Sequence, residues 1–316
     1  MFRFLIRRLA GALVVLALVA VLVFLLTRLA SGDPVALLLG DQATAADIAR
    51  VRAEYGLDRP LATQFLLWLA QVAQGHLGDS LFLQRPVTQA LLERAEPTLF
   101  LAGFAVTVAA LIGIPCGTAA AVWRGHWADQ LLSGVAMLGA SVPSFWLGLL
   151  FMQLFAVKLG WFPASGYGDP DTPLWERLHH LVLPALVLGL LNSALIIRFT
   201  RASVLDILGE DYVRTARAKG LPERRILWHH VLRNALVPIV TVLGLTLALM
   251  IGGAVVTETV FNLPGVGNLV VRAVLRRDYP VIQGTLLVIA AVYVLINLGV
   301  DLLYTVVDPR IRLEVK

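Results

Sequence analysis

The side chains able to do catalytic or redox chemistry are few in this sequence and poorly spaced for it. The one cysteine, Cys116, leaves no possibility of an internal disulfide. Histidines occur as two adjacent pairs, His179-His180 and His229-His230. Neighbours on a helix point about 100° apart, so neither pair is a ready chelate for a metal. The patterns G-x-x-x-x-G-K-[ST], H-E-x-x-H and G-x-S-x-G do not occur. We therefore expect no enzyme, no metal site and no cofactor bound by this chain.

The polar side chains inside the long apolar stretches are uncharged. A charge at mid-membrane costs at least about 3 kcal/mol and is usually functional, yet no Asp, Glu, Lys or Arg occupies the middle of a stretch. The uncharged groups either line a polar pathway or hydrogen-bond one helix to another. A transporter with neither a nucleotide site nor a proton relay must take its energy from a partner. The pathway-lining candidates are Ser141, Gln153, Asn192, Thr241, Thr246 and Asn297.

The composition points to lipid as the solvent of this chain. Of its 316 residues, 58% are hydrophobic and 15% charged, and the mean hydropathy is +0.80. A soluble domain is about half apolar and about a quarter charged. Disorder, collagen, coiled coil and a disulfide scaffold are excluded by the same figures. The net charge of +5 is then expected at the inner membrane face rather than on nucleic acid.

Six stretches free of Asp, Glu, Lys and Arg are long enough to cross a bilayer, which takes about 20 residues. They cover residues 9–27, 97–123, 130–157, 178–197, 234–257 and 279–300. The first follows three arginines, as the core of a signal peptide does, but its 19 residues exceed the usual ~7–15, so we expect an uncleaved helix. Because six is even, both termini lie on one side. Lys and Arg number 15 in the 64 residues on the N-terminal side and 11 in the 115 on the other, which predicts cytoplasmic termini.

The outer connection, residues 28–96, carries two predicted helices. The first covers about 44–55 and ends at Gly56. The second, about 61–72, has apolar residues at helical spacing with Trp68 among them. We expect this amphipathic helix to lie at the outer membrane interface, anchored by Trp68, rather than to present a ligand-binding face.

The inner connection, residues 198–234, is the most informative segment. Residues 203–206 have the form of a capping box that opens a short helix. A second short helix is predicted over about 212–219, with Gly220 just after its end and Pro222 preventing its continuation. The next helix begins there and runs into the fifth span. The alternative is a solvated, positively charged loop without a partner.

Small residues and prolines recur in the spans. Gly113 and Gly117 form a small-xxx-small pair. Gly252 and Gly253 have no side chains, so the fifth span is narrow at this point. Such positions let helices approach closely, either within one bundle or at a moving interface. Prolines within or near spans are tolerated because neighbouring groups re-satisfy the freed carbonyls. They are Pro115, Pro143, Pro184 and Pro238.

The inner segment 210–221, with 230–238 after it, resembles the "EAA" loop of bacterial ABC importer permeases, in the form found in the dipeptide/oligopeptide/nickel family. Further matches to that family are spread over nearly the whole chain. One outer loop carries the matching stretches 55–60 and 75–80, and a second carries 258–267 and 277–280. The motif Asp308-Pro-Arg310 near the C-terminus also matches. The long loop after the first span resembles the first, B-type, permease subunit. One departure is that Arg214-Thr215-Ala216 stands where the general pattern has Glu-Ala-Ala, so a contact made by that glutamate does not carry over.

The resemblance implies an all-α integral membrane protein with six transmembrane helices, the type I ABC importer permease fold, and a long extracytoplasmic loop after helix 1. The domains would be 1–96, the first helix with that loop; 97–308, the transmembrane core with a cytoplasmic coupling loop at 202–220; and 309–316, a cytoplasmic tail. It implies a subunit of the bacterial inner membrane that forms half of a translocation pathway. Its partners would be a second permease subunit, two ATPase subunits that hold ATP and Mg, and an extracytoplasmic binding protein.

The resemblance also implies a substrate class and two groups of site residues. The substrate would be a di- or oligopeptide, with nickel chelates and glutathione as alternatives. One rival from another class is a stand-alone secondary transporter, which would need an intramembrane charge that the sequence lacks. A second is a structural membrane scaffold, which gives no reason for the short helices of the inner loop. The implied ATPase-coupling residues are Asp211, Tyr212, Arg214, Thr215, Ala216, Lys219 and Gly220. The implied residues of the outer gate, on the binding-protein side, are Glu258, Phe261, Pro264, Gly265, Gly267, Arg277 and Asp278.

Physical expectations attach to both groups. Small residues at Ala216, Ala218 and Gly220 would let a short helix seat deeply in a partner's groove. In the outer segment 258–280, Pro264, Gly265 and Gly267 would shape a re-entrant turn. A basic face, made of Arg272, Arg276 and Arg277, would then meet the binding protein. The alternative for this segment is a structural plug over the pathway.

Overall fold

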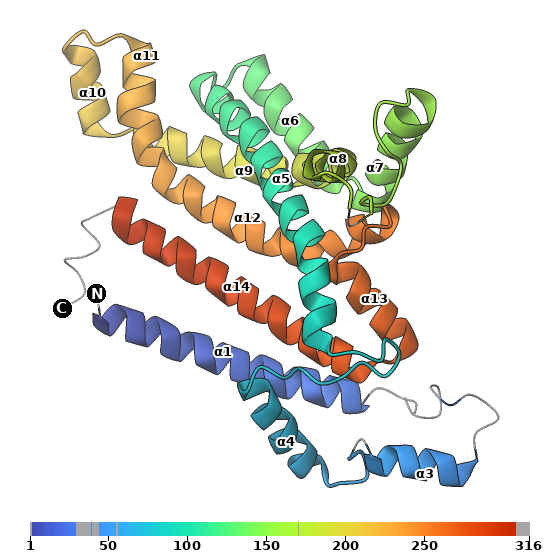
Figure 1. Cartoon of the computed structure of the whole chain (residues 1–316). Coiled ribbons are helices and arrows are strands. Elements are labelled where there is room, and N and C mark those ends of the chain that lie inside the picture. The colour runs from blue at the N-terminus through green and yellow to red at the C-terminus, as the bar shows by residue number, and fades with distance from the viewer. Residues whose placement is uncertain (1, 30–38, 40–43, 55, 170, 308–316) are drawn as a thin grey trace. The chain divides into compact units, whose positions relative to one another are not determined.

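The computed structural model of the chain describes residues 2–29, 39, 44–54, 56–169 and 171–307 (Figure 1). Within these residues the chain is helical and forms no strand, apart from an isolated bridge between Asp79 and Pro86. The predicted tail 309–316 and the Asp308-Pro-Arg310 match lie outside the described residues. The helices are α1 Phe2–Leu29, α3 Ala45–Glu54, α4 Leu61–Ala73, α5 Val87–Val122, α6 Trp127–Ser141, α7 Ser144–Phe151, α8 Leu174–His180, α9 Val182–Leu208, α10 Asp211–Ala218, α11 Glu223–Arg225, α12 Arg233–Val260, α13 Val266–Arg276 and α14 Tyr279–Val307.

Among the described residues, five helical segments are long and apolar enough to cross a membrane. They are Ile6–Leu29, Val87–Val122, Val182–Leu208, Glu223–Val260 and Tyr279–Leu302. These match five of the six predicted spans. The third predicted span is a pair of helices, Trp127–Ser141 and Ser144–Lys158, that is apolar enough to count as one span but is bent by 98°. The break is at Val142 (φ −79°, ψ 128°), because the residue before a proline is pushed out of the helical region and Pro143 has no N–H to donate.

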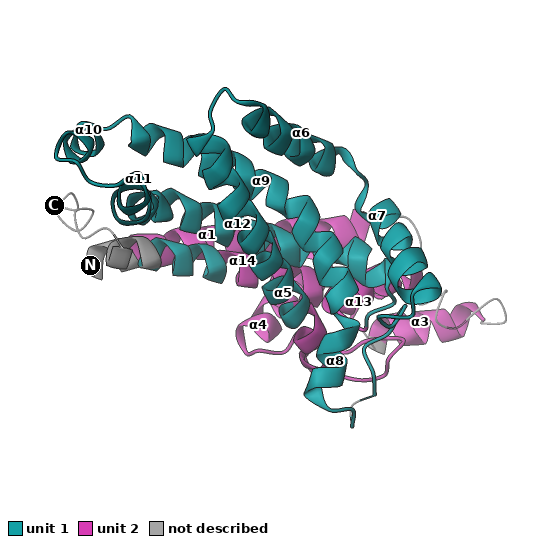
Figure 2. Ribbon diagram, turned by 90° about the horizontal axis from the view of Figure 1, so that it is seen from above, with its two compact units in different colours: residues 1, 99–263, 295–316 teal, residues 2–98, 264–294 magenta. Residues whose placement is uncertain are grey.

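The chain folds as two compact units, shown in two colours in Figure 2. One comprises residues 99–263 and those from 295 onward, and the other comprises 2–98 and 264–294. The helices α5 and α14 each contribute residues to both units. The second unit therefore joins the N-terminal segment to a segment far along the chain. The domain boundary at 96/97 stays a prediction.

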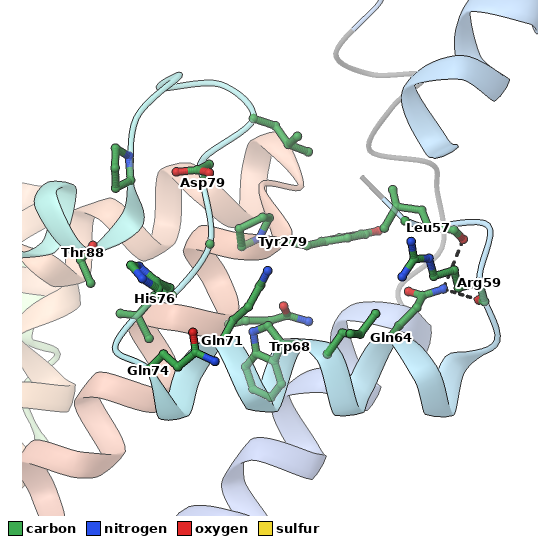
Figure 3. A pocket seen from close by; sticks show the side chains of 18 of the residues that line it. Leu57, Arg59, Gln64, Trp68, Gln71, Gln74, His76, Asp79, Thr88 and Tyr279 are labelled. Atoms are coloured by element: carbon green, nitrogen blue, oxygen red, sulfur yellow. Dashed lines mark hydrogen bonds between the residues drawn. The ribbon is translucent and has the colours of Figure 1, made fainter. Parts of the chain in front are cut away.

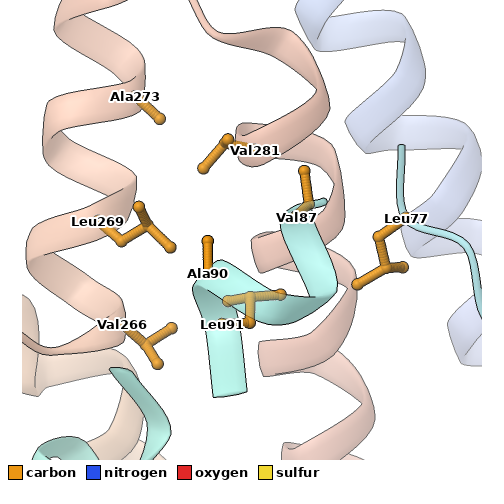
Figure 4. Close-up of a cluster of buried hydrophobic side chains, with 8 residues drawn as sticks. All are labelled: Leu77, Val87, Ala90, Leu91, Val266, Leu269, Ala273 and Val281. Atoms are coloured by element: carbon orange, nitrogen blue, oxygen red, sulfur yellow. The ribbon is translucent and has the colours of Figure 1, made fainter. Parts of the chain in front are cut away.

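The unit of residues 2–98 and 264–294 has a core built from two stretches far apart in sequence, 77–91 and 266–281 (Figure 4). Its buried side chains are Leu77, Val87, Ala90, Leu91, Val266, Leu269, Ala273 and Val281. Gly284 of α14 allows the close packing, since a Cβ there would lie 2.9 Å from Val87 Cγ1. The Thr98 hydroxyl accepts a hydrogen bond from Val266 N at 2.9 Å, which satisfies one of the free N–H groups at the start of α13.

The two predicted outer helices are both present, as α3 and α4. Thr44 and Asp47 cap α3 reciprocally: Asp47 N donates to Thr44 Oγ1, and Thr44 N donates to the Asp47 carboxylate. The Thr44 hydroxyl also donates to Asp47 Oδ2 at 2.6 Å, and this hydrogen bond, followed by the one from Thr44 N, lowers the pKa of Asp47. In α4, Phe65 and Trp68 contact the Phe24 ring of α1, with centroid distances of 5.2 and 5.9 Å. Its other apolar side chains, such as Leu66 and Leu67, are exposed, as an interface helix requires.

Helix contacts in the other unit depend on glycine, as the small-residue pair predicted. A Cβ on Gly113 would lie 2.5 Å from Ile196 Cγ2, and one on Gly117 would lie 2.6 Å from the Ile197 carbonyl oxygen. These two glycines therefore let α5 and α9 pass at close range. A Cβ added at Gly252 or Gly253 of α12 would meet nothing within 4 Å among the described residues. Within that part of the chain, these two glycines therefore do not serve close packing.

Candidate functional site: an inner helical hairpin and an outer segment

The inner segment forms a hairpin of α10 and the helix that follows it. The expected first short helix is wrong: Ser203 lies inside α9, which continues to Leu208. The capping-box pattern is overruled because the chain holds no helix breaker there and Val204 is fully buried in the apolar core. The second short helix is confirmed as α10, Asp211–Ala218.

Gly220 ends α10 in the left-handed conformation, with φ +75°. Lys219 N donates to Thr215 O, Gly220 N to Arg217 O, and Leu221 N to Ala216 O, so the last carbonyls of the helix are satisfied. A Cβ on Gly220 would find open space within 4 Å. The requirement for glycine here is therefore one of backbone conformation alone. Pro222 then precedes α11, as predicted.

Helix α10 is fixed to the rest of its unit by one apolar face. Val213 and Ala216 are 0% and 6% exposed and join a buried cluster with Val204, Ile226 and Val231. This placement contradicts our expectation that the small side chain of Ala216 seats in a partner's groove. Its size instead lets α10 approach its own unit.

Polar contacts brace the same hairpin. The Arg217 guanidinium donates two hydrogen bonds to the Glu223 carboxylate, at 2.7 and 3.2 Å, across the turn. This partner raises the pKa of Arg217, so the guanidinium stays charged. On the other side, the Asn234 amide donates to Tyr212 Oη at 3.0 Å and to the His230 carbonyl at 2.8 Å. The hairpin is therefore held at its turn and at its base.

The remaining predicted coupling residues form an exposed surface on α10 and its turn. This coupling surface is defined as Asp211, Tyr212, Arg214, Thr215, Lys219 and Gly220. Tyr212 is 41% exposed although its hydroxyl accepts the Asn234 hydrogen bond. Arg214 is largely exposed, 3.4 Å from the Asp211 carboxylate. The surface thus presents cations, one aromatic ring and a tight turn, and it lies on a hairpin that is held in place by the contacts described above.

The six predicted pathway residues are spread over four helices and the π-helical segment Met152–Lys158. Four of them donate a hydrogen bond to the carbonyl four residues earlier in their own helix: Ser141, Asn192, Thr241 and Thr246. Thr246 is fully buried. Gln153 is exposed and Asn297 is half-buried.

The predicted outer-gate residues divide between the two units. Glu258, at the end of α12, and Phe261 are 0% and 1% exposed. Phe261 O accepts from Gly166 N, and the ring lies against Gly148. Both are therefore packed within their own unit rather than displayed.

In the other unit, residues 264–276 are mostly helix rather than the expected re-entrant turn. Pro264 and Gly265 precede α13, and Gly267 is buried in its first turn. Arg272 and Arg276 lie one turn apart on the exposed side of α13. Arg277 ends the helix with φ +55° and is half-buried. A basic face is therefore present, carried by a helix.

Two of the stretches that suggested the family meet in this unit. The Ser80 hydroxyl donates to Asp278 Oδ2 at 2.5 Å, and Phe82 N donates to the same oxygen at 3.5 Å. Asp278 is 2% exposed. The carboxylate thus ties the 75–80 stretch to the start of α14, a structural role that the sequence did not indicate.

Sequence reasoning missed an ion pair between α6 and α9. Arg201 donates from Nε to Asp129 Oδ1 at 2.7 Å and from a terminal nitrogen to Oδ2 at 2.8 Å. The partners are 72 positions apart and belong to no motif, so no sequence signal paired them.

The fold and these surfaces define a helical, multi-pass membrane protein with a braced hairpin at the ends of two spans. Comparison with known proteins gives the family. The model of the binding-protein-dependent transport system inner membrane component matches residues 113–313, and the corresponding N-terminal model matches 1–102. This chain belongs to that family of ABC importer permeases.

Several curated relatives match along their whole length. A probable peptide ABC transporter permease of Sinorhizobium fredii is 45% identical over 98% of this chain and 99% of its own. The glutathione transport system permease protein GsiC of Salmonella typhimurium is 45% identical over 99% of each chain. A putative peptide transport system permease of Brucella abortus is 46% identical over 98% of each.

A solved structure has the same fold. It is a chain of the MetNI methionine ABC transporter in an inward facing conformation, with a TM-score of 0.58 and 19% identity. The match covers 70% of this chain and 97% of that one. It confirms the type I importer permease fold and gives no information on substrate.

Proposed function

We propose that this chain is the permease subunit of an ATP-driven importer of di- or oligopeptides. Two of the three relatives described above are named as peptide permeases, and each matches nearly the full chain at 45–46% identity. In this proposal the chain pairs with a second permease, and the pathway lies between the two. ATP and Mg are held by two ATPase subunits, and this chain hydrolyses nothing.

We also propose that both termini are cytoplasmic. The excess of Lys and Arg on that side supports this orientation. It places the outer loop, with α3 and α4, and the basic face of α13 on the side of the binding protein. It places the inner hairpin on the side of the ATPases.

The observation that carries the coupling role is the exposed surface on α10. A helix of only 8 residues does not hold its shape in water by itself, but here Val213 and Ala216 anchor it and Gly220 fixes its end. A rigid short helix at the ends of two spans can transmit the closure of a bound ATPase to α9 and α12.

The coupling role is tested by reversing charge on that surface. We expect Arg214→Glu with Lys219→Glu to weaken association with the ATPases in a salt-dependent way and to abolish ATP-driven uptake in proteoliposomes. Arg224→Glu, an exposed change on the neighbouring helix α11, is the matched control. Normal ATPase association and uptake in the double variant would discard the coupling surface.

Glutathione is the second candidate substrate, favoured by the 45% identity to GsiC. The two candidates are separated by uptake of a labelled tripeptide and of labelled glutathione into proteoliposomes that contain the complete importer. Peptide import predicts ATP-dependent tripeptide uptake that a thousandfold excess of glutathione does not suppress. Suppression of that uptake, with glutathione accumulating instead, would assign the importer to glutathione.

A further inference from the structure

A cavity of about 750 Å³ lies within the unit of residues 2–98 and 264–294. Its walls come from the end of α1, from α4, from the turn at 76–81 and from the start of α14. Figure 3 shows Gln64 and Gln71 of α4 beside this space, with Tyr279, His76 and Asp79 around it. Sites for small molecules usually measure about 300–1,000 Å³, so the volume suits a ligand fragment.

Three side chains of this lining carry a buried polar atom that has no hydrogen-bond partner. They are Arg28 Nε, Gln64 Oε1 and Trp68 Nε1. Gln64 is only 8% exposed, and its amide nitrogen is already engaged with the carbonyls of Leu57 and Arg59. A buried polar group without a partner is costly and needs an explanation. All three side chains line the same cavity, so a single ligand there can contact each of them.

The chemistry of the lining indicates what that ligand carries. Arg28 and Arg59 are cations, and the Arg28 guanidinium lies over the Phe24 ring at 5.4 Å, which fixes its direction. With Trp68 Nε1 they offer several N–H donors, the pattern that binds phosphate oxygens. Gln64 Oε1 and the Asp79 carboxylate are acceptors, which suit hydroxyl groups. The lining therefore fits a phosphodiester that bears a hydroxylated substituent.

The position of the cavity selects a lipid as the source of that phosphodiester. Arg28 directly follows the apolar stretch 9–27, so it lies at the depth of the lipid head groups. The neighbouring side chains of α1 and α4, such as Leu25, Leu26 and Leu66, are exposed and apolar, while Leu67 lines the cavity itself. A soluble phosphate ester would leave this apolar border without contact, whereas acyl chains would cover it.

We propose that this cavity binds the head group of phosphatidylglycerol, an anionic glycerophospholipid. The phosphodiester meets the N–H donors of Arg28, Arg59 and Trp68, and the glycerol hydroxyls donate to Gln64 Oε1 and Asp79. The leaflet follows from the proposed orientation, but the site does not depend on the transported substrate or on the coupling surface.

The test counts lipids retained by the full-length chain in native mass spectrometry after release from vesicles of phosphatidylglycerol and phosphatidylcholine. We expect one retained phosphatidylglycerol per chain. Arg28→Gln combined with Arg59→Gln should raise the apparent dissociation constant for phosphatidylglycerol about thirtyfold and so lower the retained fraction. Trp68→Phe, which keeps the ring beside Phe24, should weaken retention without disturbing the fold. Arg50→Gln removes one cation from the same loop outside the cavity and should change nothing.

The remaining outcomes also decide the proposal. Equal retention of both lipids, or retention unchanged in the Trp68→Phe and arginine variants, would overturn it. Loss of the bound lipid on adding inorganic phosphate or glycerol 3-phosphate at millimolar concentration would assign the cavity to a soluble phosphate instead. If the double arginine variant does not fold, Trp68→Phe alone decides. Failure of peptide uptake in the wild-type importer would leave this result unaffected, because the assay measures lipid binding only.

Discussion

Arg201 on α9 forms a bidentate ion pair with Asp129 in the first turn of α6. The two nitrogen–oxygen distances are 2.7 and 2.8 Å. Asp129 is 6% exposed and also accepts a hydrogen bond from Gly125 N, so it fixes the turn between α5 and α6 as well. Its carboxylate is favoured at this helix start by the helix dipole. Three helices of one unit thus depend on a single carboxylate.

Removing one partner of this ion pair should destabilise that unit. Arg201→Met leaves the Asp129 charge buried and unpaired, so we expect a loss of about 2 kcal/mol or more in the free energy of unfolding, seen as a lower melting temperature of the detergent-purified chain. Restoring neutrality with Asp129→Asn in the same chain should recover part of the loss. Arg198→Met, at an exposed position on α9, is the control. Equal melting temperatures for Arg201→Met and the control would contradict the role.

The contact between α5 and α9 should not tolerate a methyl group at Gly117. The added Cβ would lie 2.6 Å from the Ile197 carbonyl oxygen, and backbone cannot move aside as a side-chain tip can. We expect Gly117→Ala to cost about 1–3 kcal/mol. Gly103→Ala, in the same helix with open space at its Cβ, should be neutral or stabilising. The measurement is the melting temperature of the two variants. Equal melting temperatures for Gly117→Ala and Gly103→Ala would contradict the prediction.

Gly220 should be replaceable by asparagine but not by valine. At φ +75° a β-branched residue pays about 1–2 kcal/mol of backbone strain, whereas asparagine visits this region more readily. We expect Gly220→Val to insert normally but to lose ATP-driven uptake, and Gly220→Asn to keep most of it. The check is reconstituted uptake normalised to protein in the membrane. Full activity of Gly220→Val would show that the end of α10 need not be fixed.

The proposed outward orientation of segments 28–96 and 258–280 is tested by cysteine labelling. In a Cys116→Ala background, we expect cysteines at Gln84 and Leu275 to react with an impermeant maleimide from outside the inner membrane, and one at Lys219 only after the inner face is opened. Leu275 is 78% exposed and is preferred to Asn268, whose side chain is 5% exposed and would label poorly in either topology. The reverse pattern would invert the orientation.

The basic face of α13 should matter for docking of the binding protein. Arg276→Glu leaves the helix intact, because the side chain is exposed in the last turn, and it should weaken docking most at low ionic strength. Arg277 is less suitable, because it is half-buried in a left-handed conformation. Docking that is unchanged at low salt would favour the alternative, in which this segment is a plug.

Sequence reasoning worked best where one physical signal dominated. Long charge-free stretches predicted the spans, and Gly220 followed by Pro222 predicted the end of α10. It failed where a local pattern competed with tertiary packing: the capping signal at Ser203 was overruled by burial of its neighbour Val204. Ala216 was assigned to a partner from the resemblance, although Val213 and Ala216, three residues apart in a polar helix, already mark one apolar face that can pack against the protein itself.

Site residues were predicted less well than elements, because pairing requires the fold. Asp278 was included among the outer-gate residues from its motif, but only the structure shows that it holds Ser80. Asp129 and Arg201 were not singled out, since an arginine on a cytoplasmic segment is ordinarily explained by orientation alone. The polar residues of the spans were chosen for polarity, and most of them satisfy their own helix.

The π-helical segment Ile226–Leu232 joins α11 to α12 without a break. Buried side chains there fall at Ile226, Val231, Ala235 and Ile239, so the interval is five residues across this segment and four beyond it. An i→i+5 turn accommodates one residue more than an α turn does. A deletion of one residue within this segment should therefore revert it to ordinary α-helix and leave the faces of α12 in phase. The same deletion anywhere further along would rotate the rest of the span by about 100°. Length variation among natural sequences should for this reason be concentrated in these seven residues.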